Sequence, residues 1–321
     1  MNEFELIAKT FMGLEPVLAK ELTQLGANNV QIGRRMVSFT GDKEMMYRAN
    51  FQLHTAIRIL KPIAHFKASS AEDMYEEVKK IDWSKYIEKG KTFSVDSVVY
   101  CEEFRNSRFV TYKVKDAIVD QFRESTGTRP NISVSNPDIR LNIHVAEDAA
   151  TLSLDSSGES LHRRGYRQES VEAPLNEVLA AGMILLSGWT GNTDFIDPMC
   201  GSGTFIIEAL MMLTDRAPGL VRRFGFNGWN GHNHELWMSI KAEAADRHQA
   251  ALEQPLPKFY AFDADWEAVK ATKQNIIAAG FERLLDHIQI EERTLADWPN
   301  FEAEGKTAFI VTNPPYGERL G

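Results

Sequence analysis

The run of residues with the clearest chemical potential is Asn313-Pro314-Pro315-Tyr316, which follows the apolar stretch 308–311. An exocyclic amine on a nucleobase is a poor nucleophile, because its lone pair is delocalised into the ring. The Asn313 side-chain oxygen and the Pro314 carbonyl can both accept its N–H bonds and free the lone pair, while the prolines hold these acceptors in place. Tyr316 offers a face for base stacking. The run predicts activation of a base amine, and a plain proline-rich turn is the alternative.

A second motif is the glycine-rich segment DPMCGSGT at residues 197–204. Glycine after a buried strand lets the backbone turn tightly and approach a ligand, and the helix that follows offers unpaired N–H groups. The spacing matches neither a dinucleotide-binding GxGxxG motif nor an ATP-binding GxxxxGK[ST] motif. The segment therefore indicates a binding loop for another small ligand, with a structural turn as the alternative.

The third motif is Phe262-Asp263-Ala264-Asp265. Asp263 ends a predicted strand, where a carboxylate can accept both hydroxyls of a ribose. Ala264 is small enough to lie beneath an adenine ring. Asp265 is better interpreted as the N-cap of the next helix. The motif predicts a nucleoside site beside the glycine-rich segment.

The elements that must position these motifs alternate between strand and helix. This alternation predicts an α/β, doubly wound, Rossmann-like domain over residues 158–321, with a parallel sheet that binds its ligand at the carboxyl edge. We expect helices at 174–189, 204–214 and 265–279, and strands at 194–197, 258–262, 287–290 and 308–311.

The first half of the chain has a different character. Residues 1–60 have the pattern strand, helix, strand pair, helix, and residues 61–157 repeat this α+β style with a strand pair joined at Glu147-Asp148. We therefore expect two small α+β units before the domain at 158–321.

The charge distribution favours an anionic partner for the first half. Net charge is −9, but residues 1–170 hold 24 basic and 24 acidic side chains, so the acidic excess lies in the second half. Two segments, 105–129 and 161–167, are locally basic and indicate contacts with nucleic acid, with a solvated face as the alternative. The residues expected to contact the nucleic acid are Arg108, Lys113, Arg163, Arg164 and Arg167.

The cysteines and histidines favour a cytoplasmic protein without a metal. Cys101 and Cys200 lie far apart and form no CxxC pair, so a reducing compartment fits better than a disulfide framework. His232 and His234 have no third ligand nearby, so a surface loop is expected there.

Five segments together resemble the THUMP-domain RNA methyltransferases, most closely the bacterial family that forms N2-methylguanine in 23S ribosomal RNA; members are often labelled N6-adenine-specific DNA methylases. The resemblance covers essentially the whole chain. The segments are LHRRGYR (161–167), APLNEVLAAG (173–182), DPMCGSGT (197–204), FGFNGW (224–229) and NPPYGERLG (313–321).

The resemblance implies three domains: a ferredoxin-like domain over 1–60, an RNA-binding THUMP domain over 61–157, and a Rossmann-like class I methyltransferase domain over 158–321 that uses S-adenosylmethionine. It places the methionine part of the cofactor on Gly201, Ser202 and Gly203, with Asp197 nearby. It also places the carboxylate end near Pro174 and Leu175, and the ribose on Asp263. Glu292 and Asp297 compete for the adenine amine, and the register favours Glu292.

Three functions compete. Guanine-N2 methylation of 23S rRNA leads; an N6-adenine methyltransferase acting on DNA or RNA is the rival within the same chemistry. A non-catalytic RNA-binding or ribosome-assembly protein is the rival from another class. The NPPY motif occurs in enzymes that methylate several different amines, so the motif alone does not identify the substrate.

The end of the chain departs from the family pattern. Such domains normally continue through three more strands, whereas this chain ends five residues after Tyr316. We expect the strand at 308–311 to be central and buried on both faces. We therefore expect the 321 residues to be a fragment, completed by about 60–70 further residues.

Overall fold

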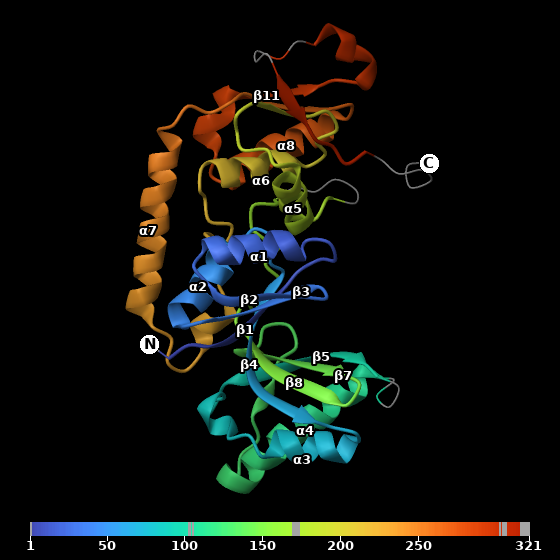
Figure 1. Cartoon of the computed structure of the whole chain (residues 1–321), viewed down its shortest axis with the longest axis vertical. Coiled ribbons are helices and arrows are strands. Elements are labelled where there is room, and N and C mark those ends of the chain that lie inside the picture. Colours follow the sequence, from blue (N-terminus) through green and yellow to red (C-terminus); the bar gives the residue numbers. More distant parts are fainter. Residues whose placement is uncertain are drawn as a thin grey trace.

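The computed structural model describes residues 2–101, 104, 106–168, 174–301, 303 and 307–314. The strands among them form two sheets, one of eight strands from the first half of the chain and one of four strands from the second half. Figure 1 shows them along the long axis, with β1–β3 between the strands β5, β7 and β8 at one end and the C-terminal sheet at the other. The expected order of α+β units followed by an α/β domain is confirmed. No helix in the described ranges is both long and apolar enough to cross a membrane.

The eight-stranded sheet has the order β2-β3-β1-β4-β8-β7-β5-β6. One strand, β4, joins its two parts: residues 58–60 pair with β1, and residues 60–67 pair with β8. The boundary expected between the first two domains, after residue 60, therefore lies inside strand β4. The elements are β1 (Phe4–Lys9), α1 (Glu15–Gln24), β2 (Asn28–Gly33), β3 (Met36–Gly41), α2 (Lys43–Gln52), β4 (Arg58–Lys67), α3 (Ala71–Lys79), η1 (Trp83–Lys85), β5 (Thr92–Tyr100), α4 (Ser107–Thr126), β6 (Asn131–Ile132), β7 (Ile139–Ala146) and β8 (Ala149–Asp155).

The four-stranded sheet is parallel and has the order β11-β10-β9-β12. In order of sequence this is 3-2-1-4, so the direction of winding reverses between β9 and β12, where doubly wound folds bind ligands. The elements are α5 (Glu177–Ser187), β9 (Asp194–Asp197), α6 (Thr204–Leu213), η2 (Gly225–Gly228), α7 (His234–Leu252), β10 (Phe259–Asp263), α8 (Trp266–Ala278), η3 (Glu282–His287), β11 (Ile288–Glu292), η4 (Leu295–Asn300) and β12 (Ala308–Ile310).

Two details of the second half differ from the expectations. Helix α5 begins at Glu177 and not at residue 174, because the Asn176 side chain caps it by accepting from the Val178 and Leu179 N–H groups. Strand β12 was expected to be buried on both faces, yet among the described residues it pairs only with β9, and Ile310 is 53% exposed.

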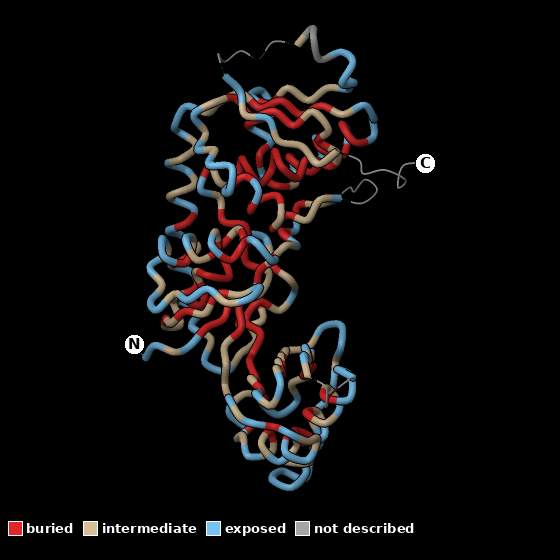
Figure 2. The backbone as a smooth tube through the Cα atoms, turned by 45° about the vertical axis from the view of Figure 1, so that its right-hand side comes forward, coloured by how far each residue is buried: buried red, intermediate tan, exposed pale blue. Residues whose placement is uncertain are grey.

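A segment of the second half completes the core of the first. Phe226 and Trp237 pack among the rings of Tyr47 and Phe51: Tyr47 stacks on Phe226 with ring centroids 4.3 Å apart, and Trp237 meets Phe51 edge-on at 5.1 Å. Figure 2 shows buried segments of backbone both in the middle of the molecule and in the part that carries the C-terminal sheet. The two halves are therefore interlocked by side-chain packing as well as joined by the chain.

This interlocking predicts unequal effects for two tryptophans. Trp237→Ala should lower the free energy of unfolding by about 3–5 kcal/mol, because it leaves a cavity in the shared core. Trp266, also on a helix but 58% exposed, serves as the control, and Trp266→Ala should change stability by about 0.5 kcal/mol or less. Urea unfolding followed by circular dichroism measures both, and equal losses would contradict the interlocked core.

Candidate functional site

The polar residues singled out in the sequence meet along one edge of the four-stranded sheet. Asp263 and Glu292 are register partners at the ends of β10 and β11, and Asp197 ends β9 opposite Ala261. Because Val311 N–H bonds to the Ile196 carbonyl, Asn313 follows β12 just beyond the same edge. The structure thus brings the three motifs together in the order of the strands.

The glycine-rich loop is held from two sides. The Asp263 carboxylate accepts from Gly201 N–H at 2.9 Å, and the side chains of Thr272 and Asn275 on α8 donate to the Gly201 and Ser202 carbonyls at 2.9 and 3.0 Å. Gly203 has a φ of +81°, and a Cβ there would lie 3.3 Å from the Thr272 backbone. A side chain is therefore excluded at Gly203 by both conformation and space.

Asp197 lies beneath this loop and is 1% exposed. Burial raises its pKa to about 7, the Met199 N–H and the Thr312 hydroxyl lower it, and the charge of Asp263 raises it further. A cationic ligand at this edge would favour the ionised form. Burial also raises the pKa of the neighbouring Cys200 thiol, which packs in the core of the C-terminal sheet.

Asp263 retains capacity for a ligand. Its carboxylate accepts from Gly201 N–H and from Asp265 N–H at 3.1 Å, and two oxygens offer about four acceptor positions. Ala264 beside it is exposed. Asp265 caps α8 by accepting from Glu267 N–H at 2.9 Å, so the structural role predicted for Asp265 is confirmed.

The two candidates for the adenine amine differ in their surroundings. Glu292 is exposed at the end of β11 and pairs in register with Asp263. Asp297 accepts from both the Thr294 N–H (3.2 Å) and the Thr294 hydroxyl (2.7 Å), so its carboxylate stabilises a turn. These contacts support the preference for Glu292.

The predicted catalytic run is described only in part. Asn313 and Pro314 are half-buried beyond the end of β12. Pro315 and Tyr316 lie outside the described residues, so the stacking role expected for Tyr316 stays a prediction.

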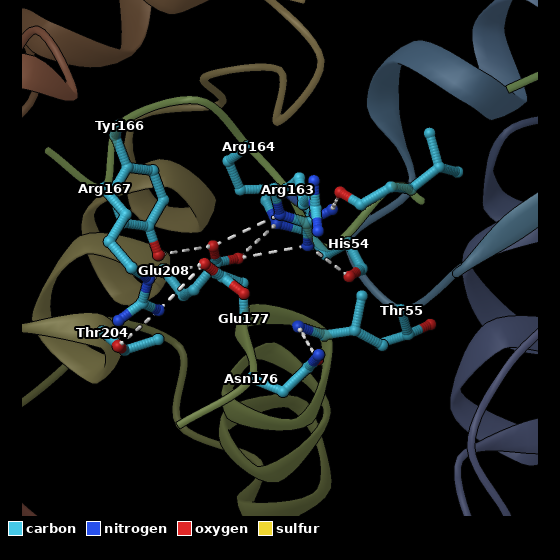
Figure 3. A network of polar contacts seen from close by, with 12 residues as sticks. His54, Thr55, Arg163, Arg164, Tyr166, Arg167, Asn176, Glu177, Thr204 and Glu208 are labelled. Carbon is cyan, nitrogen blue, oxygen red and sulfur yellow. Dashed lines mark hydrogen bonds and ion pairs between the residues drawn. The ribbon is translucent and has the colours of Figure 1, made fainter. Parts of the chain in front are cut away.

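The expected RNA contact at Arg164 is wrong in this structure, because its side chain is only 1% exposed. It bonds to Glu208 on α6 at 3.3 and 3.4 Å and to the Leu161 and His54 carbonyls, and the Tyr166 hydroxyl also reaches Glu208 (Figure 3). Burial alone would raise the pKa of Glu208, but Arg164 and His54 outweigh it and the pKa is lowered. Nothing in the sequence singles out Glu208 or His54, because neither belongs to a chemical motif.

Arg167 also points inward, so a direct RNA contact does not suit it either. Its guanidinium bonds to Glu177, to the Leu175 carbonyl and to the hydroxyls of Ser202 and Thr204. Its side chain is 19% exposed.

Three of the five expected RNA contacts remain at the surface. Arg163 is 69% exposed and pairs with Glu159, Arg108 is exposed at the start of α4, and Lys113 is 29% exposed and pairs with Glu72. Such surface pairs contribute little and do not prevent contact with an anion.

Residues 161–167 form a linker between the two halves of the chain. A pocket of about 420 Å³ lies between this linker and the start of α5. Arg163, Arg167, Leu175 and Glu177 are among the residues that line it. The pocket therefore adjoins the segment that the sequence analysis placed at the carboxylate end of the cofactor.

Family models match three consecutive parts of the chain: a ferredoxin-like domain of the RlmL type at 5–60, a THUMP domain at 68–155, and an RMKL-like methyltransferase domain at 164–321. A curated relative, the ribosomal RNA large subunit methyltransferase K/L of Acinetobacter baumannii (strain AYE), is 54% identical over 318 residues. Its counterpart from Syntrophotalea carbinolica is 44% identical over 315 residues. These matches cover 96% of this chain but only 43% and 44% of those proteins, so the chain spans less than half their length.

Solved structures give a fuller match. A protein from Listeria monocytogenes, described as a predicted N6-adenine-specific DNA methylase, is 32% identical with a TM-score of 0.88. A putative methyltransferase crystallised with S-adenosylhomocysteine is also 32% identical, with a TM-score of 0.86. Each match covers 100% of this chain and 82% of the other. The expected family is confirmed: the chain belongs to the THUMP-containing methyltransferases with an RMKL-like methyltransferase domain.

Proposed function

We propose that the chain is an S-adenosylmethionine-dependent methyltransferase that methylates the exocyclic N2 amine of a guanine in 23S rRNA. In this proposal the THUMP domain at 61–157 and the basic segment at 161–167, through Arg163, hold the RNA, and the methyltransferase domain at 158–321 carries out the transfer. The observation that carries it is the convergence of the Gly201–Gly203 loop, Asp263 and Asn313 on one sheet edge at the point where the winding reverses. The names of the curated relatives and the bound product in a structural relative support the substrate and the cofactor.

The order of residues along the edge suggests how the cofactor would be held. Its amino-acid part would lie on Gly201, Ser202 and Gly203, near Asp197, Pro174 and Leu175. The ribose would meet Asp263, and the adenine would lie over Ala264 toward Glu292. The cofactor supplies an activated methyl group, so the protein's task is to orient the acceptor amine and not to supply a strong base.

Asn313 and Pro314 would provide that orientation. The Asn313 side-chain oxygen and the Pro314 carbonyl accept the two N–H bonds of the amine, which turns its lone pair away from the ring and toward the methyl group. Tyr316 would stack on the base. Adenine-N6 methylation uses the same chemistry and is the rival reaction, since a structural relative is described as an adenine methylase. The match to a THUMP domain favours RNA over DNA.

Nucleoside mass spectrometry of rRNA from a deletion strain tests the substrate directly. Loss of one N2-methylguanine, restored by the wild-type gene, would support the proposal. Loss of an N6-methyladenine would point to the rival reaction, and an unchanged set of nucleosides with retained RNA binding would point to a non-catalytic role.

The ribose contact gives the first prediction for this function. Asp263→Ala should weaken S-adenosylmethionine binding about tenfold or more, because charge-assisted bonds to hydroxyls are lost. Asp265→Ala, two residues away, removes a helix cap and should cost about 0.5–2 kcal/mol of stability while leaving affinity nearly unchanged. Calorimetric titration measures both variants; wild-type affinity in Asp263→Ala would show that Asp263 only braces the loop.

The second prediction concerns the chemical step. In the full-length protein, Asn313→Ala should lower turnover about 100-fold or more, because one preorganised acceptor for the reacting amine is lost. Cofactor affinity should stay near the wild-type value, since Asn313 faces the amine. A variant with near-normal turnover would remove Asn313 from the mechanism.

The third prediction concerns RNA. Arg108 and Arg163 are exposed, so reversing both charges (Arg108→Glu, Arg163→Glu) should weaken binding and reduce the slope of log K against log salt by about 0.7 per lost phosphate contact. Lys85, 71% exposed and outside both basic segments, serves as the control. RNA binding measured by filter retention over a salt series should be unaffected by Lys85→Glu; an unchanged slope in the double variant would mean that both arginines are merely solvated.

A further inference from the structure

Arg167 joins three segments that are separate in the sequence. Its Nε and Nη2 atoms donate to the Glu177 carboxylate at 3.1 and 2.8 Å, and Nη2 donates to the Leu175 carbonyl at 3.0 Å. Its Nη1 atom donates to the Ser202 hydroxyl at 2.6 Å, and Nη2 reaches the Thr204 hydroxyl at 3.2 Å. Figure 3 shows the guanidinium between the start of α5 and the start of α6.

The partners of Arg167 are themselves fixed. Glu177, Ser202 and Thr204 are 5%, 3% and 3% exposed, so none of them can easily turn to water instead. A buried carboxylate at Glu177 needs a cation beside it, and the planar fork of arginine satisfies a carboxylate and further acceptors at once. Lysine, a single ammonium with three donors, cannot span the same set of acceptors.

Arg167 connects two segments that face each other across its guanidinium. One is residues 174–177, which line the pocket, and the other is the glycine-rich loop with the start of α6. We propose that Arg167 is a positioning residue that fixes the distance between Leu175 and Ser202, and thereby shapes the pocket for the amino-acid end of S-adenosylmethionine; this rests on the proposed function. The role of Arg167 is distinct from RNA contact, because its donors are directed into the protein.

Arg164 provides a matched control. It lies three residues earlier in the chain and is also buried. Like Arg167, which pairs with Glu177 of α5, it pairs with a buried glutamate, Glu208 of α6. Its other bonds go to the Leu161 and His54 carbonyls, and it makes no hydrogen bond to residues 174–177 or 201–203 within the described chain. Arg164 also lines the pocket but does not connect residues 174–177 to the glycine-rich loop, so Arg164→Lys should lower stability without a selective loss of one ligand.

The test compares two ligands. S-adenosylhomocysteine carries the amino-acid end, whereas 5′-methylthioadenosine keeps the adenosine and the thioether but lacks it. Calorimetric titration is done at a temperature where wild type, Arg167→Lys and Arg164→Lys are all folded by circular dichroism. Arg167→Lys should weaken S-adenosylhomocysteine binding about tenfold and leave methylthioadenosine binding within about twofold, whereas Arg164→Lys should leave the ratio of the two affinities unchanged.

A second variant covers the case in which Arg167→Lys does not fold. Thr204→Val removes only a hydroxyl that accepts from Arg167 at the start of α6, at a residue not placed against the cofactor, and should also weaken S-adenosylhomocysteine selectively. Where both single variants fold, the double variant should bind no more weakly than the weaker single one, because the two residues act through one link.

The outcomes separate the inference from the function on which it rests. Wild-type protein that binds neither ligand would contradict the proposed cofactor, whatever Arg167 does. With normal wild-type binding, the inference is overturned by an equal loss for both ligands, by no loss in Arg167→Lys, or by additive losses in the double variant.

Discussion

The buried ion pair between Arg164 and Glu208 is the constraint on which the arrangement of the molecule depends. Both side chains are 1% exposed or less, so each charge is stabilised by the other and by the bonds around them, and removal of one partner would leave an uncompensated charge in the interior. Arg164 also holds the His54 carbonyl of the first unit. The pair therefore fixes the linker on α6 and the first unit on the linker at the same point.

From this point the linker runs along α6. Arg164 bonds to Glu208 and Arg167 bonds to Thr204. Glu208 and Thr204 lie one helical turn apart on one face of α6. The linker thus connects the α+β half to the edge of the C-terminal sheet where the polar motifs lie, and it is held by buried and partly buried hydrogen bonds. Two of its three arginines, Arg164 and Arg167, pair with buried glutamates, and only Arg163 stays exposed for contact with an anion.

Two further features make the chain one body. Strand β4 joins the two α+β units of the first half in one sheet, and Phe226 and Trp237 from the second half fill the core beneath Tyr47 and Phe51. A surface on the α+β half is therefore held at a set distance from the sheet edge. In the proposed function, such a fixed distance would contribute to the choice of the target base.

The sequence by itself determined the order of elements, the carboxyl-edge position of the three motifs and the cap at Asp265, because glycine loops, strand-end acids and caps act over a few neighbouring residues. It did not reveal α7, the continuous β4, or the inward direction of Arg164 and Arg167. An arginine in the sequence has the same appearance whether it is solvated, bound to phosphate or paired with a buried glutamate. Only the tertiary structure decides among these, because the outcome depends on which distant residue lies within hydrogen-bond reach and whether water is excluded there.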